Sequence, residues 1–311
     1  MNKVTAGYFM RGEDPPIDID PRYEWVCVRN ATIKVPDRVQ WCKDRQAEGM
    51  KVMLHLAICY ADPSYGGEPH DQVHALLGNH GFLLDDKNKR VPNGTPWKLI
   101  DMRETEPYGK QLALILANYL TKYEFVPDGL FLDFMWERVE WKTHTDIDDD
   151  WKSGMDLFMS RFNYWLAWKG GVNWQNCKLF LNGFHVNVSA DGIAYENFPN
   201  ILWGSDHSVD RTIFGERGVV ETSAFFKDNP TLILMKGGNN VAYDIPESVV
   251  EESVDLAYEF CTNGAVIFDN SGYVFDILDD DPPEPPLETP LDIKILVSGT
   301  VENPTVEIVE E

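Results

Sequence analysis

Three short apolar segments of the sequence each end in an acidic residue, and this recurring feature constrains the fold most. Residues 128–137 run through Gly-Leu-Phe-Leu to Asp133, residues 192–198 contain Glu196 at the end of an apolar run, and residues 264–270 reach Asp269 in the same way. A carboxylate in such a run is costly unless it meets a partner or opens onto water. Short apolar strands that alternate with amphipathic helices predict a parallel barrel, in which the carboxyl ends of the strands meet at one face.

Apolar periodicity predicts eight strands with interleaved helices, which is the count of a (β/α)8 TIM barrel, here over residues 1–278. The expected strands are residues 4–10, 25–29, 51–60, 129–134, 178–182, 192–195, 231–235 and 265–268. The expected helices are residues 37–48, 107–123, 151–168, 209–227 and 246–261. The first two strands are joined by a Pro- and Asp-rich loop without room for a helix. Residues 61–103 show no strong period, so this long insertion after the third strand is expected to be a lid or a binding loop.

The C-terminal part of the chain has a different character. Residues 279–290 are acidic and rich in proline, which predicts an extended linker. Residues 291–311 alternate like two strands of a short hairpin, and two isolated strands are marginally stable in water. We therefore expect this tail to dock on the barrel, on another subunit of a homo-oligomer, or on an assembly partner.

Charge and cysteine usage narrow the classes of partner. The formal net charge is −24, with 51 acidic and 27 basic residues. Such a surface repels phosphate backbones, so nucleic acid is excluded as an expected partner, whereas neutral or cationic sugars fit. The 5 cysteines show no CxxC spacing, and the acidic run 146–150 lacks the EF-hand glycine and glutamate, so no metal or cofactor is expected. No membrane span or signal peptide is visible, which predicts a soluble protein, cytoplasmic or virion-associated.

Asp133 and Glu196 are the predicted catalytic pair. Hydrolysis of a glycosidic bond needs two carboxyl groups on opposite sides of the sugar, one to donate a proton and one to attack carbon or activate water. Asp133 ends the fourth expected strand and Glu196 the sixth, so the two can face each other across the barrel mouth. Two alternatives stay open: Asp133 as a structural acid that caps a loop or pairs with Arg138, and Glu196 as an acid bonded to loop amides.

Other polar and aromatic residues near the ends of the expected strands are candidates for binding a sugar. Aromatic rings stack on the apolar faces of sugars, and amides, acids and histidines bond hydroxyl groups. Asp269 is equally compatible with substrate contact and with capping of a turn, and Asn182 with bonding its own loop. His55, inside the third strand, is interpreted as a buried, hydrogen-bonded histidine. The predicted substrate-binding residues are Asn182, Asp269, Glu137, Trp136, Trp203, His185 and His207.

Four segments give the chain a resemblance to known enzymes: Tyr8-Phe9, residues 51–55, residues 128–133 and residues 194–199. Over roughly residues 4–275 the chain resembles glycoside hydrolases with a TIM barrel whose specificity is uncertain. More distantly it is similar to endo-α-1,4-polygalactosaminidase-like and α-galactosidase-like barrels. The resemblance implies a catalytic acid after the fourth strand and another after the sixth, with Asp133 as nucleophile or base and Glu196 as acid/base.

The leading hypothesis is a glycoside hydrolase that cleaves a neutral or amino-sugar polysaccharide. The alternative is a non-catalytic carbohydrate-binding or structural barrel, part of a phage particle or a surface assembly. A depolymerase carried on a phage tail would combine both. The linker and the tail that needs a docking partner motivate this alternative.

Overall fold

A computed structural model of the chain provides the structure. It describes residues 3–10, 13–62, 64, 66–91, 95–133, 135, 147–182, 189–197, 221–237, 240–241, 245–279, 293–300 and 303–310.

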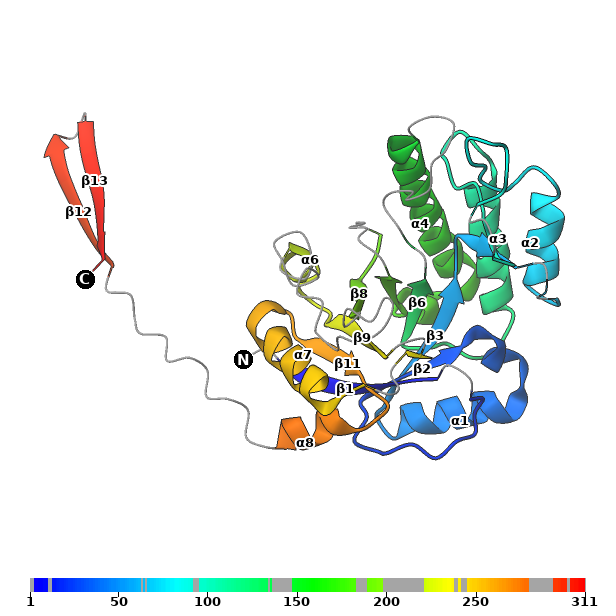
Figure 1. The fold of residues 1–311 in the computed structure, drawn as a ribbon, viewed down its shortest axis with the longest axis horizontal. Helices are drawn as coiled ribbons and strands as arrows, with labels where there is room; N and C mark the ends of the chain where they lie inside the picture. The colour runs from blue at the N-terminus through cyan, green and yellow to red at the C-terminus, as the bar shows by residue number, and fades with distance from the viewer. Residues whose placement is uncertain are drawn as a thin grey trace.

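Eight parallel strands close into a barrel, which confirms the predicted (β/α)8 fold (Figure 1). The strands are β1 (Val4–Phe9), β2 (Trp25–Arg29), β3 (Lys51–Ala57), β6 (Gly129–Asp133), β7 (Lys178–Asn182), β8 (Gly192–Asn197), β9 (Thr231–Gly237) and β11 (Ala265–Phe268). They pair in the order β9, β11, β1, β2, β3, β6, β7, β8, and pairing of β8 with β9 closes the ring. A short strand, β10 (Asn240–Val241), extends β9 in the antiparallel direction.

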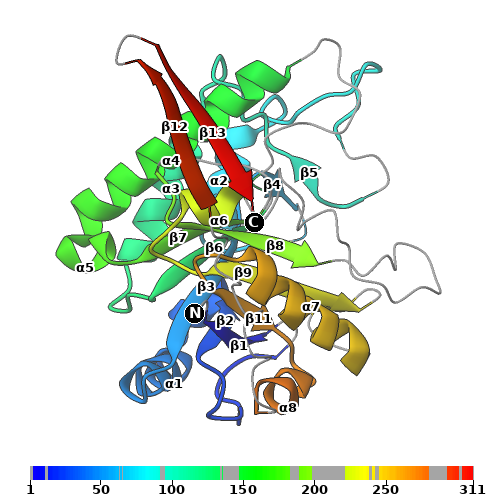
Figure 2. The same cartoon turned by 90° about the vertical axis from the view of Figure 1, so that its left-hand side faces the viewer.

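Helices connect the strands and cover the outside of the barrel. They are α1 (Pro36–Ala47), α3 (Tyr108–Thr121), α4 (Asp148–Gly170), α5 (Val172–Gln175), α6 (Glu221–Phe225), α7 (Glu247–Phe260) and α8 (Tyr273–Asp279), with a 3-10 helix η1 at Asn30–Lys34. Helices α7 and α8 pack on the side of β1 and β11 (Figure 2). Proline at the first position of α1 costs no intrahelical hydrogen bond, and Gly49, with φ of +97°, follows its end.

Two helices differ in extent from the sequence prediction. Helix α4 begins at Asp148 rather than near Trp151, and its first turn holds Asp148, Asp149 and Asp150. Carboxylates are stabilised at that position because the amide dipoles leave the N-terminus of a helix partly positive. Of the helix predicted over residues 209–227, α6 accounts for Glu221–Phe225, and residues 201–220 lie outside the described part.

The interior of the barrel is a single apolar cluster to which all eight strands contribute. Side chains alternate between the two faces of a strand, so every second residue points inward. The inward residues are Phe9, Cys27, Met53, Phe131, Phe180, Ala194, Leu232, Leu234, Val266 and Phe268. Gly7 and Gly192 leave room for the rings of Phe268 and Phe180, because a Cβ at either glycine would lie within 2.7 Å of a ring carbon. The barrel interior is therefore filled by side chains below the mouth.

The insertion between β3 and α3 contains regular elements that the sequence pattern did not reveal. Strands β4 (Tyr60–Ala61) and β5 (Lys98–Leu99) pair in the antiparallel direction, and α2 (His70–Leu77) lies between them in the chain. Helix α2 buries only Val73 and Leu77, which is too few apolar positions to produce a visible helical period.

The two strands predicted in the C-terminal tail form an antiparallel hairpin of β12 (Ile293–Thr300) and β13 (Asn303–Glu310). What the tail docks against stays a prediction. In the described part of the chain, no helix combines the length and the apolar character needed to cross a membrane.

Candidate active site at the barrel mouth

Asp133 lies at the mouth, which is the face of the barrel formed by the carboxyl ends of the parallel strands. It is the last residue of β6 and stands two positions after Phe131, which belongs to the interior cluster. Residues two apart in a strand share a face, so Asp133 follows Phe131 on the inner side. Its side chain is 16% exposed. The carboxylate is thus placed at the boundary between the apolar interior and the surface.

Both oxygens of the Asp133 carboxylate contact nitrogen atoms from the flanking strands. The amide of Asn182, at the end of β7, donates from Nδ2 to Oδ1 over 2.7 Å. Nε2 of His55, on β3, lies 3.1 Å from Oδ2. Backbone hydrogen bonds from Ile58 to the Asp133 carbonyl and from Met135 to the Asn182 carbonyl continue the pairing beyond these residues. Three adjacent strands therefore bring one acid, one amide and one imidazole together.

His55 is a site residue that the sequence interpretation placed in the core. The structure confirms its hydrogen bond, but 26% of the side chain is exposed. Its ring packs against both Phe9, with ring centroids 5.7 Å apart, and Phe131, at 5.5 Å. The signal that could have revealed it is the alternation along β3: Met53 is an inward residue, so His55 lies on the same face one step nearer the mouth.

Glu196 lies in β8, which β7 separates from β6. In the strand pairing Asn182 is level with Ala194, and Glu196 is level with Leu234 of β9. Position 196 is two residues beyond the inward Ala194 and so shares its strand face. The Glu196 side chain is outside the described part of the structure, so the facing of the two carboxyl groups across the mouth stays a prediction.

Asp269 caps the turn that leads into α8. Its side chain is fully buried, Oδ1 accepts hydrogen bonds from the backbone and hydroxyl of Ser271, and Oδ2 accepts one from the backbone of Val274. Burial raises the pKa of this carboxyl above its ordinary value. The sequence allowed either a turn cap or a substrate contact, and these contacts are those of a turn cap. Because the side chain has no exposed surface, it is not available to a substrate in this structure.

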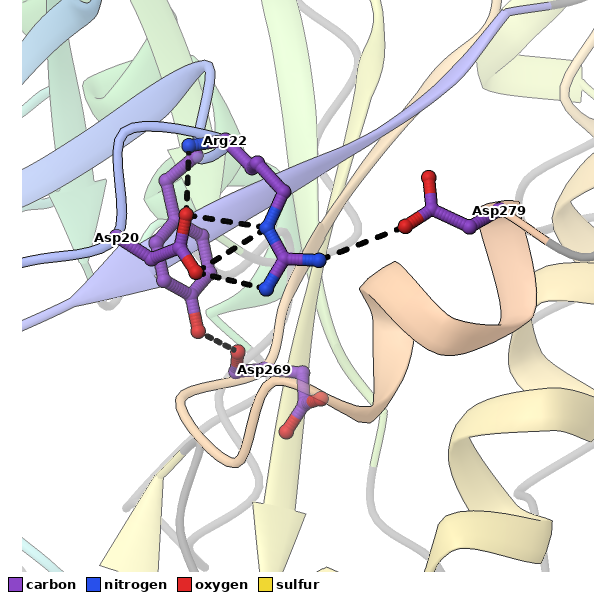
Figure 3. Close-up of polar contacts among 5 residues, drawn as sticks. Asp20, Arg22, Asp269 and Asp279 are labelled. Carbon is purple, nitrogen blue, oxygen red and sulfur yellow. Dashed lines mark hydrogen bonds and ion pairs between the residues drawn. The ribbon is translucent and has the colours of Figure 1, made fainter.

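The loop that precedes β2 packs beside the same turn (Figure 3). The hydroxyl of Tyr23 donates to the Asp269 carbonyl oxygen over 2.8 Å. Arg22 forms a salt bridge with Asp20 at 2.8 Å and reaches Asp279 of α8 at 3.5 Å. The irregular connection between β1 and β2 thus anchors the last helix of the barrel.

A basic residue and an amide also lie at the described part of the mouth, and sequence reasoning missed both. Arg29 ends β2, level with His55, and pairs with Asp14 at 2.9 Å. Asn270 binds the backbone of Phe9 twice, accepting from its N–H and donating to its carbonyl, each over 2.9 Å. This clamp holds the end of β1, whose Phe9 ring supports His55.

Several predicted site residues lie outside the described part of the structure: Trp136, Glu137, Trp203, His185 and His207. Arg138, the alternative partner of Asp133, is also outside it. Another aromatic residue, Trp97 of the insertion, packs against Tyr60 with ring centroids 5.6 Å apart. Within the described ranges no group of three or more His, Cys, Asp or Glu residues is placed to hold a metal ion.

Comparisons with known proteins support the fold. The sequence matches no protein-family model. It also matches no curated protein. The structure is similar to the glycoside hydrolase domain of PelA from Pseudomonas aeruginosa, with a TM-score of 0.55 and 16% identity over 86% of this chain and 94% of that chain. It is also similar to Ega3 from Aspergillus fumigatus, solved in complex with galactosamine, with a TM-score of 0.50 and 12% identity over 86% of this chain and 91% of that chain. The chain therefore has the TIM-barrel fold seen in glycoside hydrolase domains.

Proposed function

We propose that the protein is a glycoside hydrolase whose active site lies at the barrel mouth. The observation that carries the proposal is the Asp133 carboxylate, held at the end of β6 by Asn182 and His55. In TIM-barrel enzymes the catalytic groups come from the carboxyl ends of strands. A partly exposed acid with two side-chain partners at this position supports a chemical role for Asp133. The similarity to glycoside hydrolase domains supports the same reaction class, as an analogy at the level of the fold.

In this proposal Asp133 acts as nucleophile or base and Glu196 as acid/base. Nδ2 of Asn182 can only donate, so Oδ1 of Asp133 is an acceptor. An acceptor carboxylate suits attack on carbon or activation of water better than proton donation. The second carboxyl must then protonate the leaving oxygen, and we assign this role to Glu196 because its position in β8 is two residues beyond the inward Ala194. The separation of the two groups decides between retention, at about 5–5.5 Å, and inversion, at about 6.5–9.5 Å.

The proposed substrate is a polysaccharide that contains amino sugars. The structure of Ega3 was solved with galactosamine, a sugar that carries an amino group. A chain with a formal net charge of −24 attracts a cationic polymer and repels an anionic one. Polymers of galactosamine with different degrees of N-acetylation are therefore the first substrates to test.

The experiment measures reducing ends released from such a polymer by the wild type and by Asp133→Asn, Glu196→Gln and Asp255→Asn. Asp255 is exposed on α7 and serves as the matched control. Loss of a general acid or base costs about 10²–10⁴ in rate. We expect losses of that size for the first two variants, with melting temperatures close to the wild type, and full activity for the control.

Other outcomes identify other functions. Binding of the polymer without release of reducing ends by the wild type would favour a carbohydrate-binding barrel. Unfolding of Asp133→Asn would mark the acid as structural. Activity of Asp133→Asn at the wild-type level would refute its catalytic role. If the wild type cleaves the polymer, NMR of the anomeric proton in the first product distinguishes retention from inversion.

A further inference from the structure

His55 contacts the proposed catalytic carboxylate, but the proposed chemistry gives it no part in proton transfer or bond formation. We propose that His55 is a positioning residue: with its proton on Nε2 it donates to Oδ2 of Asp133 and, together with Asn182, fixes the plane of the carboxylate that faces the sugar. This inference rests on the proposed function, because the carboxylate needs a fixed plane only if it reacts.

Two side chains anchor the Asp133 carboxylate, one on each of its oxygens. A carboxylate rotates about the bond to its Cβ with little preference between orientations. Asn182 holds Oδ1 at 2.7 Å from β7, and His55 contacts Oδ2 at 3.1 Å from β3, on the other side of β6. Two anchors on opposite sides remove that rotation. The attacking oxygen is then presented in one orientation, which is what reaction at a sugar carbon requires.

The imidazole ring of His55 is itself held in place. This matters because a mobile imidazole could not fix the orientation of the Asp133 carboxylate. Phe9 lies edge-on to the His55 ring at 5.7 Å and Phe131 lies tilted against it at 5.5 Å. These two rings also contact each other at 5.7 Å, and Asn270 clamps the backbone of Phe9. Two phenylalanine rings and one backbone clamp thus set the direction of Nε2.

The contact with Asp133 also decides which ring nitrogen of His55 carries the proton. A neutral imidazole carries its proton on only one nitrogen, and the partner of each nitrogen selects which. An ionised carboxylate only accepts hydrogen bonds, so the nitrogen that faces it must be the protonated one. Nε2 faces Asp133, and the tautomer with hydrogen on Nε2 follows. This assignment can be tested independently of catalysis.

The kinetic test compares His55→Gln, which keeps an N–H donor of similar reach, with His55→Leu, which does not. The matched control is Gln46→Leu, because Nε2 of Gln46 also donates to a carboxylate, Oδ2 of Asp128 at 2.9 Å, directly before β6 and so at the end of that strand opposite Asp133. Misplacement of a reacting group by about 1 Å costs about 10²-fold. We expect His55→Leu to lose about 10²-fold in kcat with little change in KM, His55→Gln to recover most of that loss, and Gln46→Leu to keep the wild-type kcat. Equal losses in the glutamine and leucine variants, or no loss in either, would overturn the positioning role.

A spectroscopic test separates this inference from the proposed function. The ¹⁵N-coupled proton NMR spectrum should show a ring proton on Nε2 of His55 that exchanges slowly with water in the wild type, and this signal should disappear in Asp133→Ala. A wild-type ring with its proton on Nδ1 and none on Nε2, or an Nε2 signal unchanged in Asp133→Ala, would refute the contact. If the wild type cleaves no glycan but shows the signal, the proposed hydrolase fails while the contact between His55 and Asp133 stands, and the role in positioning for catalysis is withdrawn with the hydrolase.

Discussion

Substitution of Gly154 by alanine should separate α4 from the insertion that packs against it. A Cβ at Gly154 would lie 1.7 Å from the carbonyl oxygen of Met102, 2.7 Å from the amide nitrogen of Glu104 and 2.8 Å from the carbonyl carbon of Arg103. Ordinary van der Waals contact begins at 3.4 Å, twice the first of these distances. All three atoms belong to the backbone, so no side chain can rotate away and either α4 or the segment around Met102 must move.

The expected cost follows from these distances. Overpacking of a tight interface costs about 1–3 kcal/mol and occasionally more, and a backbone clash belongs at the upper end. Replacing glycine by alanine inside a helix returns up to about 1 kcal/mol. We therefore expect Gly154→Ala to lower the free energy of unfolding by about 2–3 kcal/mol, and the melting temperature by roughly 4–12 °C.

Gly109 of the neighbouring helix α3 is the matched control. Helices α3 and α4 pack together, and a Cβ at Gly109 would meet the Met102 side chain at 3.4 Å and the carbonyl oxygens of Met102 and Gly154 at 3.8 Å. These are ordinary contacts, so Gly109→Ala should be neutral or stabilising by up to about 1 kcal/mol. Urea unfolding followed by circular dichroism, with calorimetry, measures both variants. Equal stability of the two variants would refute the packing argument.

Two further predictions concern buried ionisable groups. Burial raises the pKa of Asp269, so the folded protein binds this proton more tightly than the unfolded chain, and stability falls as pH rises from about 3.8 through the raised value. Asp269→Asn cannot ionise and should show a smaller fall in urea unfolding free energy over that range; a fall as large as in the wild type would assign it to other groups. All five cysteines are buried, and burial raises the pKa of Cys42 and Cys261 to about 12, so few thiolates form at neutral pH. A thiol reagent such as DTNB should therefore react with 5 equivalents only after unfolding in guanidinium, and fast labelling of the native protein would contradict this.

Much of the fold could be predicted from sequence because each barrel strand is a run of apolar residues that are adjacent in the chain. Residues 129–133 and 265–268 are short apolar runs that the structure buries on both faces, as expected for parallel strands between a filled interior and outer helices. The start of α1 follows from Pro36, and its end from Gly49. Helix α2 was missed because it is only 8 residues long and buries only Val73 and Leu77, which is too short a pattern to show an amphipathic period.

The candidate site was only partly predictable. The position of Asp133 at a strand end was visible in the sequence, and so was that of Asn182. The contact between them was not, because it depends on the pairing of β6 with β7. His55 was interpreted as a core residue because its neighbours in sequence are apolar, and the structure shows that β3 carries it towards the mouth. Asp269 has the same sequence setting as Asp133, yet the turn that follows it folds back and occupies both of its oxygens.

The sequence by itself determined the eight barrel strands, the four long helices α1, α3, α4 and α7, and that several acids stand where strands end. These properties depend on residue types a few positions apart, since apolar periodicity and the residues that begin and end helices act within one element. Only the tertiary structure decided that Asp133 binds side chains of the two flanking strands, whereas Asp269 is buried as the cap of a turn. That difference arises from strand register and barrel closure, which join residues 78 positions apart, as in the contact of His55 with Asp133.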